Sequence, residues 1–563
     1  MVASTIEQQP KPPPVIARPR GRSTRRAPLP LLIAALLVAL LMLSPAIYLA
    51  IRATDAGAEA FTILKRPHNI EIIRNSIVLA VLVGLTSALI GVPFAWLLER
   101  TDLPARRLFS IMSPLPLAIP SYVGALAFIE FLGPRGMVQR FLADHTTIDT
   151  IPSIYGFWGS YLALTLFTFP YVLLQVRATF TRLDPSFDDA ARSLGHGPWR
   201  TFVRTTLPLL RPAIVAGALL SALYAISDFG VVTLLRYDTF TRAIYTQYRS
   251  SFNRSNAAVL ALVLVLFAVI LVSAEIALRG RAVYHRVGGG ARREPKRIAL
   301  GRWKIAAVAF CSGVLFLGLG IPVLVILWWL IDRKGQVEST SRLLTAMWHS
   351  LELGAIVGLG TLLIALPVAI LSVRFRSRLA NTIERICYLG YGLPGIVIAL
   401  TFVFFGIRVA TPLYQTLPLL IIALAIRHLP QALGAERSSL LTVNPRVEEA
   451  ARSLGRNAGA TFAHVTLPLA RSGFVAGWAL VFVAVMKELP ITLLLAPIEY
   501  RTLATEIWTA SGSGAYSDAA VPALILVVIA SLPTLLFRTE RRQASTESDE
   551  SAARSLTPDP TAT

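Results

Sequence analysis

The stretch Glu448-Glu449-Ala450-Ala451-Arg452-Ser453-Leu454-Gly455 interrupts a mostly apolar chain with charged and small residues. A near copy, Asp188-Asp189-Ala190-Ala191-Arg192-Ser193-Leu194-Gly195, lies 260 residues earlier. When Ser186–Leu209 is aligned with Arg446–Leu469, 12 of 24 positions are identical. We call these two segments the first and second polar islands, and their similarity indicates an internal duplication.

The composition is that of a membrane protein. Only 15% of the 563 residues are charged and the mean hydropathy is +0.61, whereas soluble proteins carry about 25% charged residues. Many windows reach the roughly 20 apolar residues of a spanning helix, without the alternation of a β-barrel. We therefore expect an all-α polytopic membrane protein. The net charge of +22 does not indicate nucleic-acid binding, because Lys and Arg lie in short blocks between apolar runs.

The apolar runs predict about twelve spans, six in each half. In the first half they are roughly 30–51, 75–98, 108–132, 155–176, 211–235 and 256–278. In the second half they are roughly 304–331, 350–373, 386–407, 413–430, 471–495 and 519–537. The expected organisation is a disordered cytoplasmic tail (1–29), a first module (30–278), a basic cytoplasmic linker (279–303), a second module (304–537) and a polar cytoplasmic tail (538–563).

The distribution of Lys and Arg predicts the orientation. These residues concentrate in every second loop, and the connector 279–304 alone carries nine of them. The positive-inside bias therefore places both termini and both islands in the cytoplasm. Because six spans precede the second copy, the two modules have the same orientation and form a parallel repeat. The pairs Asn75-Ser76 and His349-Ser350 extend this repeat, at an offset of 274 residues.

Each island is expected to form two short helices joined by a turn, outside the bilayer. Asp184-Pro185 and Asn444-Pro445 each read as an N-cap followed by Pro at the first helical position. Gly195 and Gly455 read as C-caps that adopt a positive φ. The second helix of each island is expected to end at its Leu-Pro pair, Leu207-Pro208 or Leu467-Pro468. A solvated loop is the alternative, but two matching copies favour a docking surface.

The second island resembles the EAA loop of binding-protein-dependent ABC transporter permeases. The shared pattern is Glu449-Ala450-Ala451, three residues, Gly455, nine residues and then Val465–Pro468. The first island departs from it, with Asp189 in place of Glu and Thr205 in place of the usual Ile. The resemblance implies two fused type I importer permease modules whose islands are coupling helices. The implied ATPase-docking residues are Asp188, Asp189, Ala190, Ala191, Gly195, Leu207, Pro208, Glu448, Glu449, Ala450, Ala451, Gly455, Leu467 and Pro468.

The same resemblance implies partners and a location. Two copies of a cytoplasmic ABC ATPase would bind ATP–Mg and dock on the islands, and a periplasmic solute-binding protein would dock on the opposite side. The chain would be a multi-pass protein of the bacterial inner membrane, would bind no cofactor and would not be an enzyme. The sequence agrees in lacking a GxxxxGK[ST] phosphate loop.

Three ionisable residues lie within the predicted fifth spans: Asp228 in the first half, and Lys487 and Glu488 in the second. Ionisable residues inside a span are by default functional candidates. We therefore take all three as candidate pathway or gate residues, with an interfacial cap as the alternative. Gly230 and Pro490, which follow them, predict a break in each helix.

The segments around these residues are similar to those of ferric-iron importer permeases. They are Ser227–Gly230, Lys487–Leu494 and Thr502–Trp508. Acids along a path would suit a hard trivalent cation, although no set of metal ligands is assigned. Thiamine permeases of the same fused architecture, and related polyamine or phosphonate importers, leave other solutes open. An ATP-independent secondary transporter with two six-span halves is a further alternative, but such halves would lack the islands.

Overall fold

The computed structural model describes residues 27–55, 59–147, 150–181, 183, 191, 193–250, 254–280, 297–331, 340–375 and 377–532. The described residues form helices and one isolated β-bridge, between Thr101 and Ile298. Nine of these helices are long and apolar enough to cross a membrane, and two bent helix pairs would each add one span. The expected all-α polytopic fold is therefore confirmed. The predictions for residues 1–26, for most of the linker and for 538–563 lie outside the described residues.

The helices of the first half are α1 (Leu29–Asp55), α2 (Glu59–Lys65), α3 (Pro67–Arg100), α4 (Arg106–Met112), η1 (Leu115–Ala118), α5 (Ser121–Leu132), α6 (Met137–His145), α7 (Phe157–Phe180), α9 (Pro198–Thr201), η2 (Phe202–Thr206), α10 (Leu207–Ser227), α11 (Gly230–Leu234), α12 (Phe240–Ser250) and α13 (Arg254–Gly280). Those of the second half are η3 (Gly301–Trp303), α14 (Lys304–Leu315), η4 (Phe316–Gly320), α15 (Ile321–Ile331), α16 (Thr340–Arg374), α17 (Arg378–Leu389), η5 (Gly390–Gly392), α18 (Gly395–Arg408), η6 (Thr411–Leu413), α19 (Leu417–Thr442), α20 (Pro445–Ser453), α21 (Ala458–Thr461), η7 (Phe462–Thr466), α22 (Leu467–Met486), α23 (Pro490–Leu495), α24 (Leu503–Ser513) and η8 (Tyr516–Ala519). A final apolar helix covers Tyr516–Leu532.

Two spans that were expected to be single helices are broken instead. The expected span 108–132 consists of α4–η1 and α5, bent by 100°, and 386–407 falls in α17–η5 and α18, bent by 101°. The breaks lie at Pro120 and Pro394, which both have extended backbone angles. Proline has no N–H to continue a helix, and it disfavours helical geometry in the residue before it. The break therefore recurs at the same position of the repeat.

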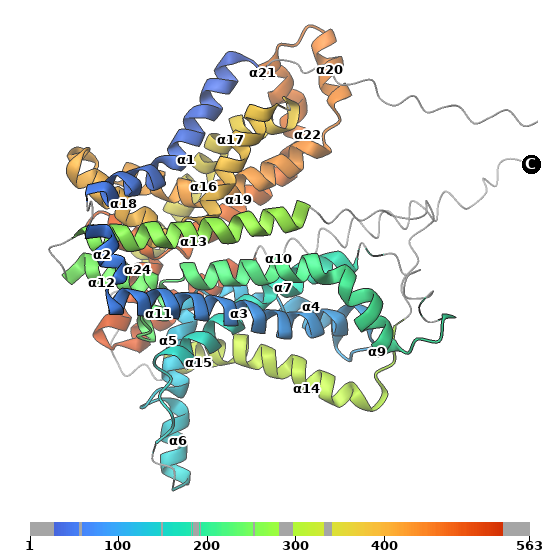
Figure 1. Cartoon of the computed structure of the whole chain (residues 1–563), viewed down its shortest axis with the longest axis vertical. Helices are drawn as coiled ribbons and strands as arrows, with labels where there is room; N and C mark the ends of the chain where they lie inside the picture. The colour runs from blue at the N-terminus through green and yellow to red at the C-terminus, as the bar shows by residue number, and fades with distance from the viewer. Residues whose placement is uncertain are drawn as a thin grey trace, which may run out of the picture.

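The tertiary contacts repeat as well. The helices α3, α7 and α10 pack together in the first half, as α16, α19 and α22 do in the second (Figure 1). The Phe240 N–H donates to the Ser76 hydroxyl at 2.9 Å, and the Leu503 N–H donates to the Ser350 hydroxyl at 2.8 Å. The repeat predicted at Asn75-Ser76 and His349-Ser350 is thereby confirmed in the structure.

Each half is held by the first span of the other. Helix α1 packs against α16 and α17 of the second half, besides α13 of its own. Reciprocally, α14–α15 run along the first half, where α15 contacts α5 (Figure 1). The two halves are therefore interlocked, and movement of one half displaces a helix that packs on the other.

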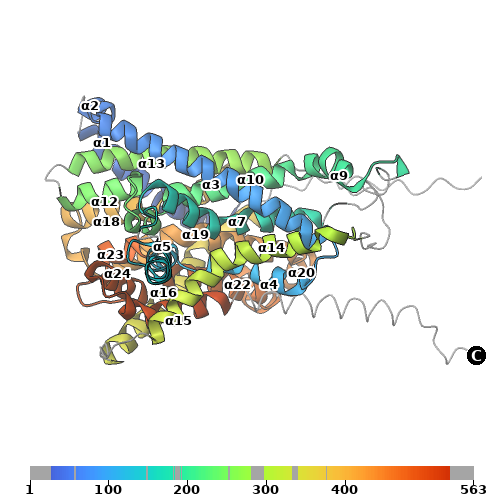
Figure 2. The ribbon, with the colours of Figure 1, turned by 90° about the horizontal axis from the view of Figure 1, so that it is seen from below.

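Both islands lie at the same end of the helix bundle. Helix α9 of the first island lies at the right of both views and α20 of the second lies right of centre in both, whereas α2, α12 and α24 lie at the left (Figures 1 and 2). This arrangement agrees with the parallel repeat, because the two islands must then face the same side.

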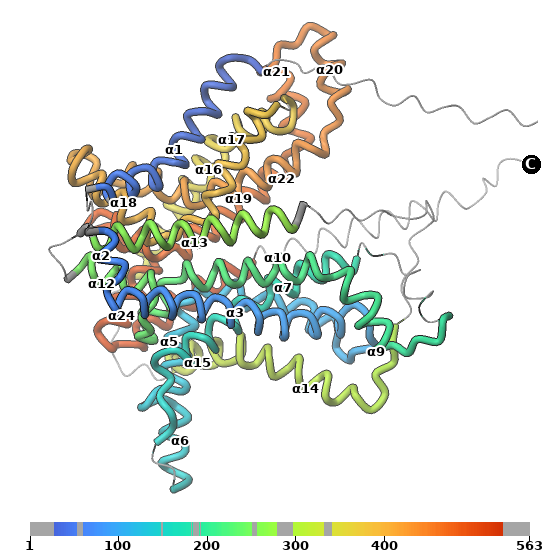
Figure 3. The backbone as a smooth tube through the Cα atoms, in the orientation of Figure 1, coloured from blue at the N-terminus to red at the C-terminus, as the bar shows by residue number. Residues whose placement is uncertain are grey.

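The prediction that the second helix of each island ends at its Leu-Pro pair is wrong. Instead it continues into the next span as one helix, Pro198–Ser227 in the first half and Ala458–Met486 in the second (Figure 3). Both copies contain a π-helical turn just before this pair, Phe202–Thr206 or Phe462–Thr466. Such a turn changes the helical hydrogen-bond pattern where the proline cannot donate. The second helix of each island is therefore a continuous extension of α10 or α22.

Candidate functional site

The second island has the caps that its sequence predicts. Helix α20 begins where the Asn444 side chain accepts the Arg446 N–H at 3.1 Å. It ends at Ser453, and in the turn that follows Gly455 has a φ of +85° and the Arg456 N–H donates to the Ala451 carbonyl at 3.2 Å. A positive φ favours glycine because it carries no Cβ. The turn to α21 is therefore determined by the local sequence.

The first island has the same C-terminal turn. Gly195 has a φ of +80°, and the His196 N–H donates to the Ala191 carbonyl at 3.1 Å. The candidate docking residues Asp188, Asp189 and Ala190 lie outside the described residues.

Glu448 points into its own chain. Only 8% of the residue is exposed, and its Oε1 accepts hydrogen bonds from Arg374 Nη2 at 2.8 Å and the Thr466 hydroxyl at 2.9 Å. Arg374 ends α16, and its Nη2 also contacts the carbonyls of Leu440 and Val443 at the end of α19. Glu448 thus ties α20 to α16, α19 and η7. We call this set of contacts the Glu448 tether.

The outer surface of the second island consists of other residues. Glu449, Ala450 and Gly455 are exposed, whereas Ala451 is buried. Leu454 is 84% exposed, and its repeat counterpart Leu194 is 78% exposed. The exposed leucine thus recurs at the same place of both polar segments. These leucines were not among the predicted docking residues, although the duplicated Ser-Leu-Gly was a usable signal.

The Leu-Pro pairs lie at the base of the islands. Leu207 and Pro208 are half-buried, and Leu467 and Pro468 are exposed. Since both pairs belong to the continuous helices, they connect each island to its membrane span.

The fifth spans break where the sequence predicts. Helix α10 ends at Ser227 before α11, and α22 ends at Met486 before α23. In each half this break packs on the break of the third span. A Cβ added to Gly230 would lie 2.8 Å from the Cβ of Tyr122, and one added to Gly395 would clash with Glu488. The ionisable candidates thus lie on the two fifth-span breaks, and each of these breaks packs on the third-span break of its own half.

Asp228 caps a helix. It is 7% exposed, its Oδ1 accepts the Val231 N–H at 2.8 Å, and Val232 and the Ser121 hydroxyl also bond to its carboxylate. These partners satisfy the carboxylate at the start of α11. The geometry therefore favours the cap that we considered as the alternative for this residue.

Glu488 occupies the corresponding place in the second half, but its surroundings differ. The Ile491 N–H bonds to its carboxylate, whereas its Oε1 is buried without a hydrogen-bond partner among the described residues. The Tyr122 hydroxyl is also buried and unpartnered there.

Two basic side chains hold the breaks of the third spans. Lys487 Nζ donates to the Leu117 carbonyl at 3.1 Å, which joins the two halves. Arg427 Nη1 donates to the Leu393 carbonyl at 2.9 Å. Sequence reasoning missed Arg427 and the adjacent buried His428, although the rule on ionisable residues inside spans applied to them equally. Within the described residues, no group of three or more His, Cys, Asp or Glu could hold a metal ion.

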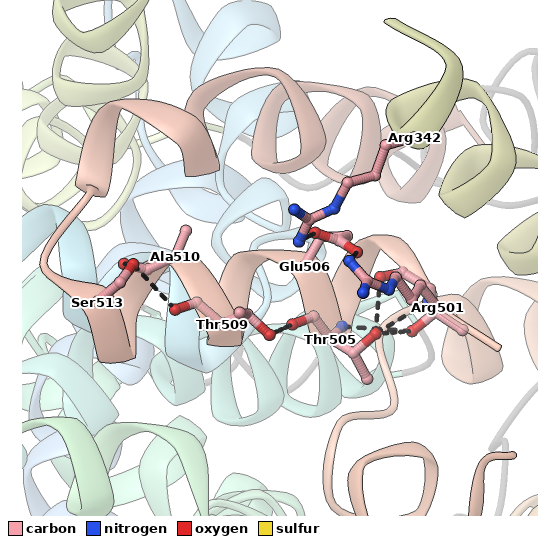
Figure 4. A network of polar contacts seen from close by, with 8 residues as sticks. Arg342, Arg501, Thr505, Glu506, Thr509, Ala510 and Ser513 are labelled. Atoms are coloured by element: carbon pink, nitrogen blue, oxygen red, sulfur yellow. Dashed lines mark hydrogen bonds and ion pairs between the residues drawn. The ribbon is translucent and has the colours of Figure 1, made fainter. Parts of the chain in front are cut away.

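A separate polar network lies at the end opposite the islands. Glu506 of α24, which is 5% exposed, accepts Arg342 Nη2 at 2.6 Å and forms an ion pair with Arg501 at 3.5 Å (Figure 4). Arg342 belongs to the first turn of α16. This network therefore fixes α24 to one end of α16, and Arg374 at the other end of α16 holds α20.

Comparison with known proteins identifies the family. The model of the family described as "Binding-protein-dependent transport system inner membrane component" matches residues 87–278 and 361–539. The Fe(3+)-transport system permease protein FbpB 2 of Haemophilus influenzae is 35% identical, over 91% of this chain and 99% of its own length. The ferric transport system permease protein FbpB of Actinobacillus pleuropneumoniae is 23% identical, over 86% and 73%.

The molybdenum transport system permease protein ModB of Escherichia coli is 30% identical, over 32% of this chain and 80% of its own length. It therefore resembles a segment no longer than one of the two halves. The family match occurs once in each half, around both islands and their following spans. On this evidence, the chain belongs to the family of binding-protein-dependent transport system inner membrane components.

Proposed function

We propose that this chain is the membrane-spanning permease subunit of an ATP-driven ABC importer that carries ferric iron, delivered by a periplasmic binding protein. The observation that carries the proposal is the 35% identity to an Fe(3+)-transport system permease over 99% of that protein. So long an alignment extends over both halves, both islands and the four helix breaks.

In this proposal each island docks on one of two cytoplasmic ATPase subunits. The exposed Glu449, Ala450 and Leu454 supply the contact surface of the second island. ATP–Mg binds to the ATPase subunits, and this chain binds no cofactor. The N- and C-termini lie in the cytoplasm with the islands, and the binding protein docks at the end that contains α12 and α24.

The islands transmit movement through rigid connections. Helix α21 of the second island continues without a break into α22, and the Glu448 tether joins α20 to the ends of α16 and α19. A shift of α20 therefore moves three of the second half's spans together. ATP binding would favour one arrangement of the two halves over the other, because the closed ATPase pair binds that arrangement more tightly.

Transport by purified components tests the proposal. The permease, its ATPase and its binding protein are reconstituted in vesicles, and radioactive iron uptake is measured with ferric iron loaded on the binding protein. We expect uptake that requires ATP and all three components. ATP-dependent uptake of thiamine, a polyamine, a phosphonate or an oxyanion instead of iron would refute ferric iron as the substrate. Uptake without the ATPase would point to a secondary transporter.

A further inference from the structure

We propose that Phe229, Tyr245 and Trp508 form the outer gate of the transport path, which closes it at the end opposite the islands and opens when the two halves move. Phe229 lies in the break between α10 and α11, Tyr245 on α12 and Trp508 on α24. We call these three rings the aromatic plug. The inference rests on the proposed ATP-driven import and adds to it the residues at which the halves separate.

The aromatic plug joins the two halves through one side chain. Phe229 is 2% exposed, and its ring packs on two others at nearly equal distances. The centroid of Phe229 lies 4.9 Å from that of Tyr245, in its own half, and 5.2 Å from that of Trp508, in the other half. Both distances are those of favourable aromatic pairs. One ring is thus held between α12 and α24.

The two rings that hold Phe229 occupy equivalent positions of the repeat. The hydrogen bonds to the hydroxyls of Ser76 and Ser350 align α12 with α24, and in this alignment Tyr245 corresponds to Trp508. Equivalent residues can both contact one side chain only close to the axis that relates the halves. In a parallel repeat this axis runs along the membrane normal, and the transport path lies at the interface of the repeats. The aromatic plug therefore lies across the path.

The contact between the halves differs at the two ends of the bundle. Among the described residues, the helices α3, α7 and α10 form no extended contact with α16, α19 and α22. In Figure 1, α10 and α22 run apart towards the islands. At the opposite end α12 packs against α18, where the ring centroids of Tyr248 and Phe404 lie 6.1 Å apart. The halves are therefore joined at the end where the aromatic plug lies, as in a path that is closed on this side.

The contact between Phe229 and Trp508 is the one that can separate. Within the first half, the Thr241 hydroxyl donates to the Asp228 carbonyl at 2.5 Å, so the backbone beside Phe229 is fixed to the first turn of α12. The ring of Tyr245 adds to this attachment. Across the halves, Phe229 packs on Trp508 without a hydrogen-bonding group of its own. When the closed ATPase pair moves the islands, α10 and α22 move with them, and Phe229 leaves Trp508 but stays on Tyr245.

Paired cysteines test the gate, because the two ring contacts of Phe229 have nearly the same length. In the complete complex, Phe229→Cys is combined with Trp508→Cys or, as the matched control, with Tyr245→Cys. A short bismethanethiosulfonate reagent links each pair while the ATPase subunits are empty or trapped with ATP and vanadate. We expect the pair across the halves to be linked about 10-fold less in the trapped state, the effect of about 1.4 kcal/mol, and the control pair to be linked equally. The native Cys311 and Cys387 are buried, and the treated wild type controls for them.

Two functional measurements complete the test. Linkage across the halves should stop ATP-dependent iron uptake, whereas linkage of the control pair should preserve it. Trp508→Ala weakens only the closed arrangement, so ATP hydrolysis without the binding protein should rise by about 10-fold, again the effect of about 1.4 kcal/mol. Trp508→Phe keeps a ring and should restore the low rate. Normal membrane levels and melting temperatures exclude misfolding of the variants.

The outcomes separate the gate from the proposed function. Linkage across the halves that is the same in both states, or uptake that continues after linkage, refutes the gate and leaves the importer function intact. An unchanged rate of ATP hydrolysis in Trp508→Ala also refutes the gate. If linkage across the halves responds to the state of the ATPase but the wild type takes up no iron, the gate stands and ferric iron fails as the substrate. Transport by the wild type without an ATPase would refute both proposals.

Discussion

Replacing Arg374 with methionine should uncouple the second island from the membrane helices. The substitution removes the charged partner of Glu448 but keeps an apolar side chain of similar length. The two side chains are 17% and 11% exposed, so little solvent screens their contact. Removing one partner of a buried ion pair costs about 3 kcal/mol. Because every 1.4 kcal/mol is a factor of ten, the ordered position of α20 should be disfavoured by about 100-fold.

The assay is binding of the ATPase subunit to the permease in nanodiscs, together with iron uptake in vesicles. We expect ATPase affinity at the second island to weaken by up to about 100-fold, with normal levels of protein in the membrane. Arg437→Met is the matched control. It breaks an ion pair with Glu384, at 2.8 Å, that joins α19 to α17 without touching the island. This control should leave ATPase affinity unchanged.

A double-mutant cycle decides whether the Glu448 tether is responsible. Adding Glu448→Gln to Arg374→Met removes the carboxylate charge that is left without its Arg374 partner. The double variant should therefore bind the ATPase more tightly than Arg374→Met alone. The interaction energy should lie within about 0.5–3 kcal/mol. If the free-energy effects of the two single substitutions on ATPase binding add in the double variant to within about 0.5 kcal/mol, the Glu448 tether is refuted.

Three further changes have defined outcomes. Gly455 has open space around it but a φ of +85°, so Gly455→Asp strains the turn by about 1–2 kcal/mol. This variant should abolish uptake while membrane levels stay normal, and full uptake would contradict the docking role. Gly230→Ala places a Cβ 2.8 Å from the Cβ of Tyr122 and should reduce the free energy of unfolding by about 1–3 kcal/mol. The melting temperature should therefore fall, and an unchanged melting temperature would refute this close packing. Lys304, and secondarily the Leu300 N–H, lower the pKa of Asp102 below 3.8, so its contribution is complete above that value and lost as the pH falls through the lowered pKa. The protection of the Ile298 amide against exchange, relative to an unstructured peptide at the same pH, should therefore fall only there, and a fall near pH 6 would contradict the prediction.

Much of the architecture was predictable from local patterns. The apolar runs indicated the membrane helices, and the spacing of the islands indicated the repeat. The caps at Asn444 and Gly455 follow from short-range chemistry, which needs no distant partner. The breaks after Ser227 and Met486 were predictable for the same reason. The bends of 100° and 101° at Pro120 and Pro394 were missed because a proline inside an apolar run also occurs in helices that remain continuous, such as α3 at Pro93.

The amino-acid sequence by itself determined that this is a duplicated helical membrane protein with two matching polar islands. It also identified the acids at the fifth-span breaks. Only the tertiary structure decided the partners of individual residues: Glu448 faces inward on Arg374, Asp228 accepts the Val231 N–H, and Glu488 retains a buried oxygen without a partner among the described residues. The physical reason is that hydrogen-bond partners for a buried carboxylate come from helices far apart in the chain. Periodicity and spacing describe one helix at a time and contain no information about those partners.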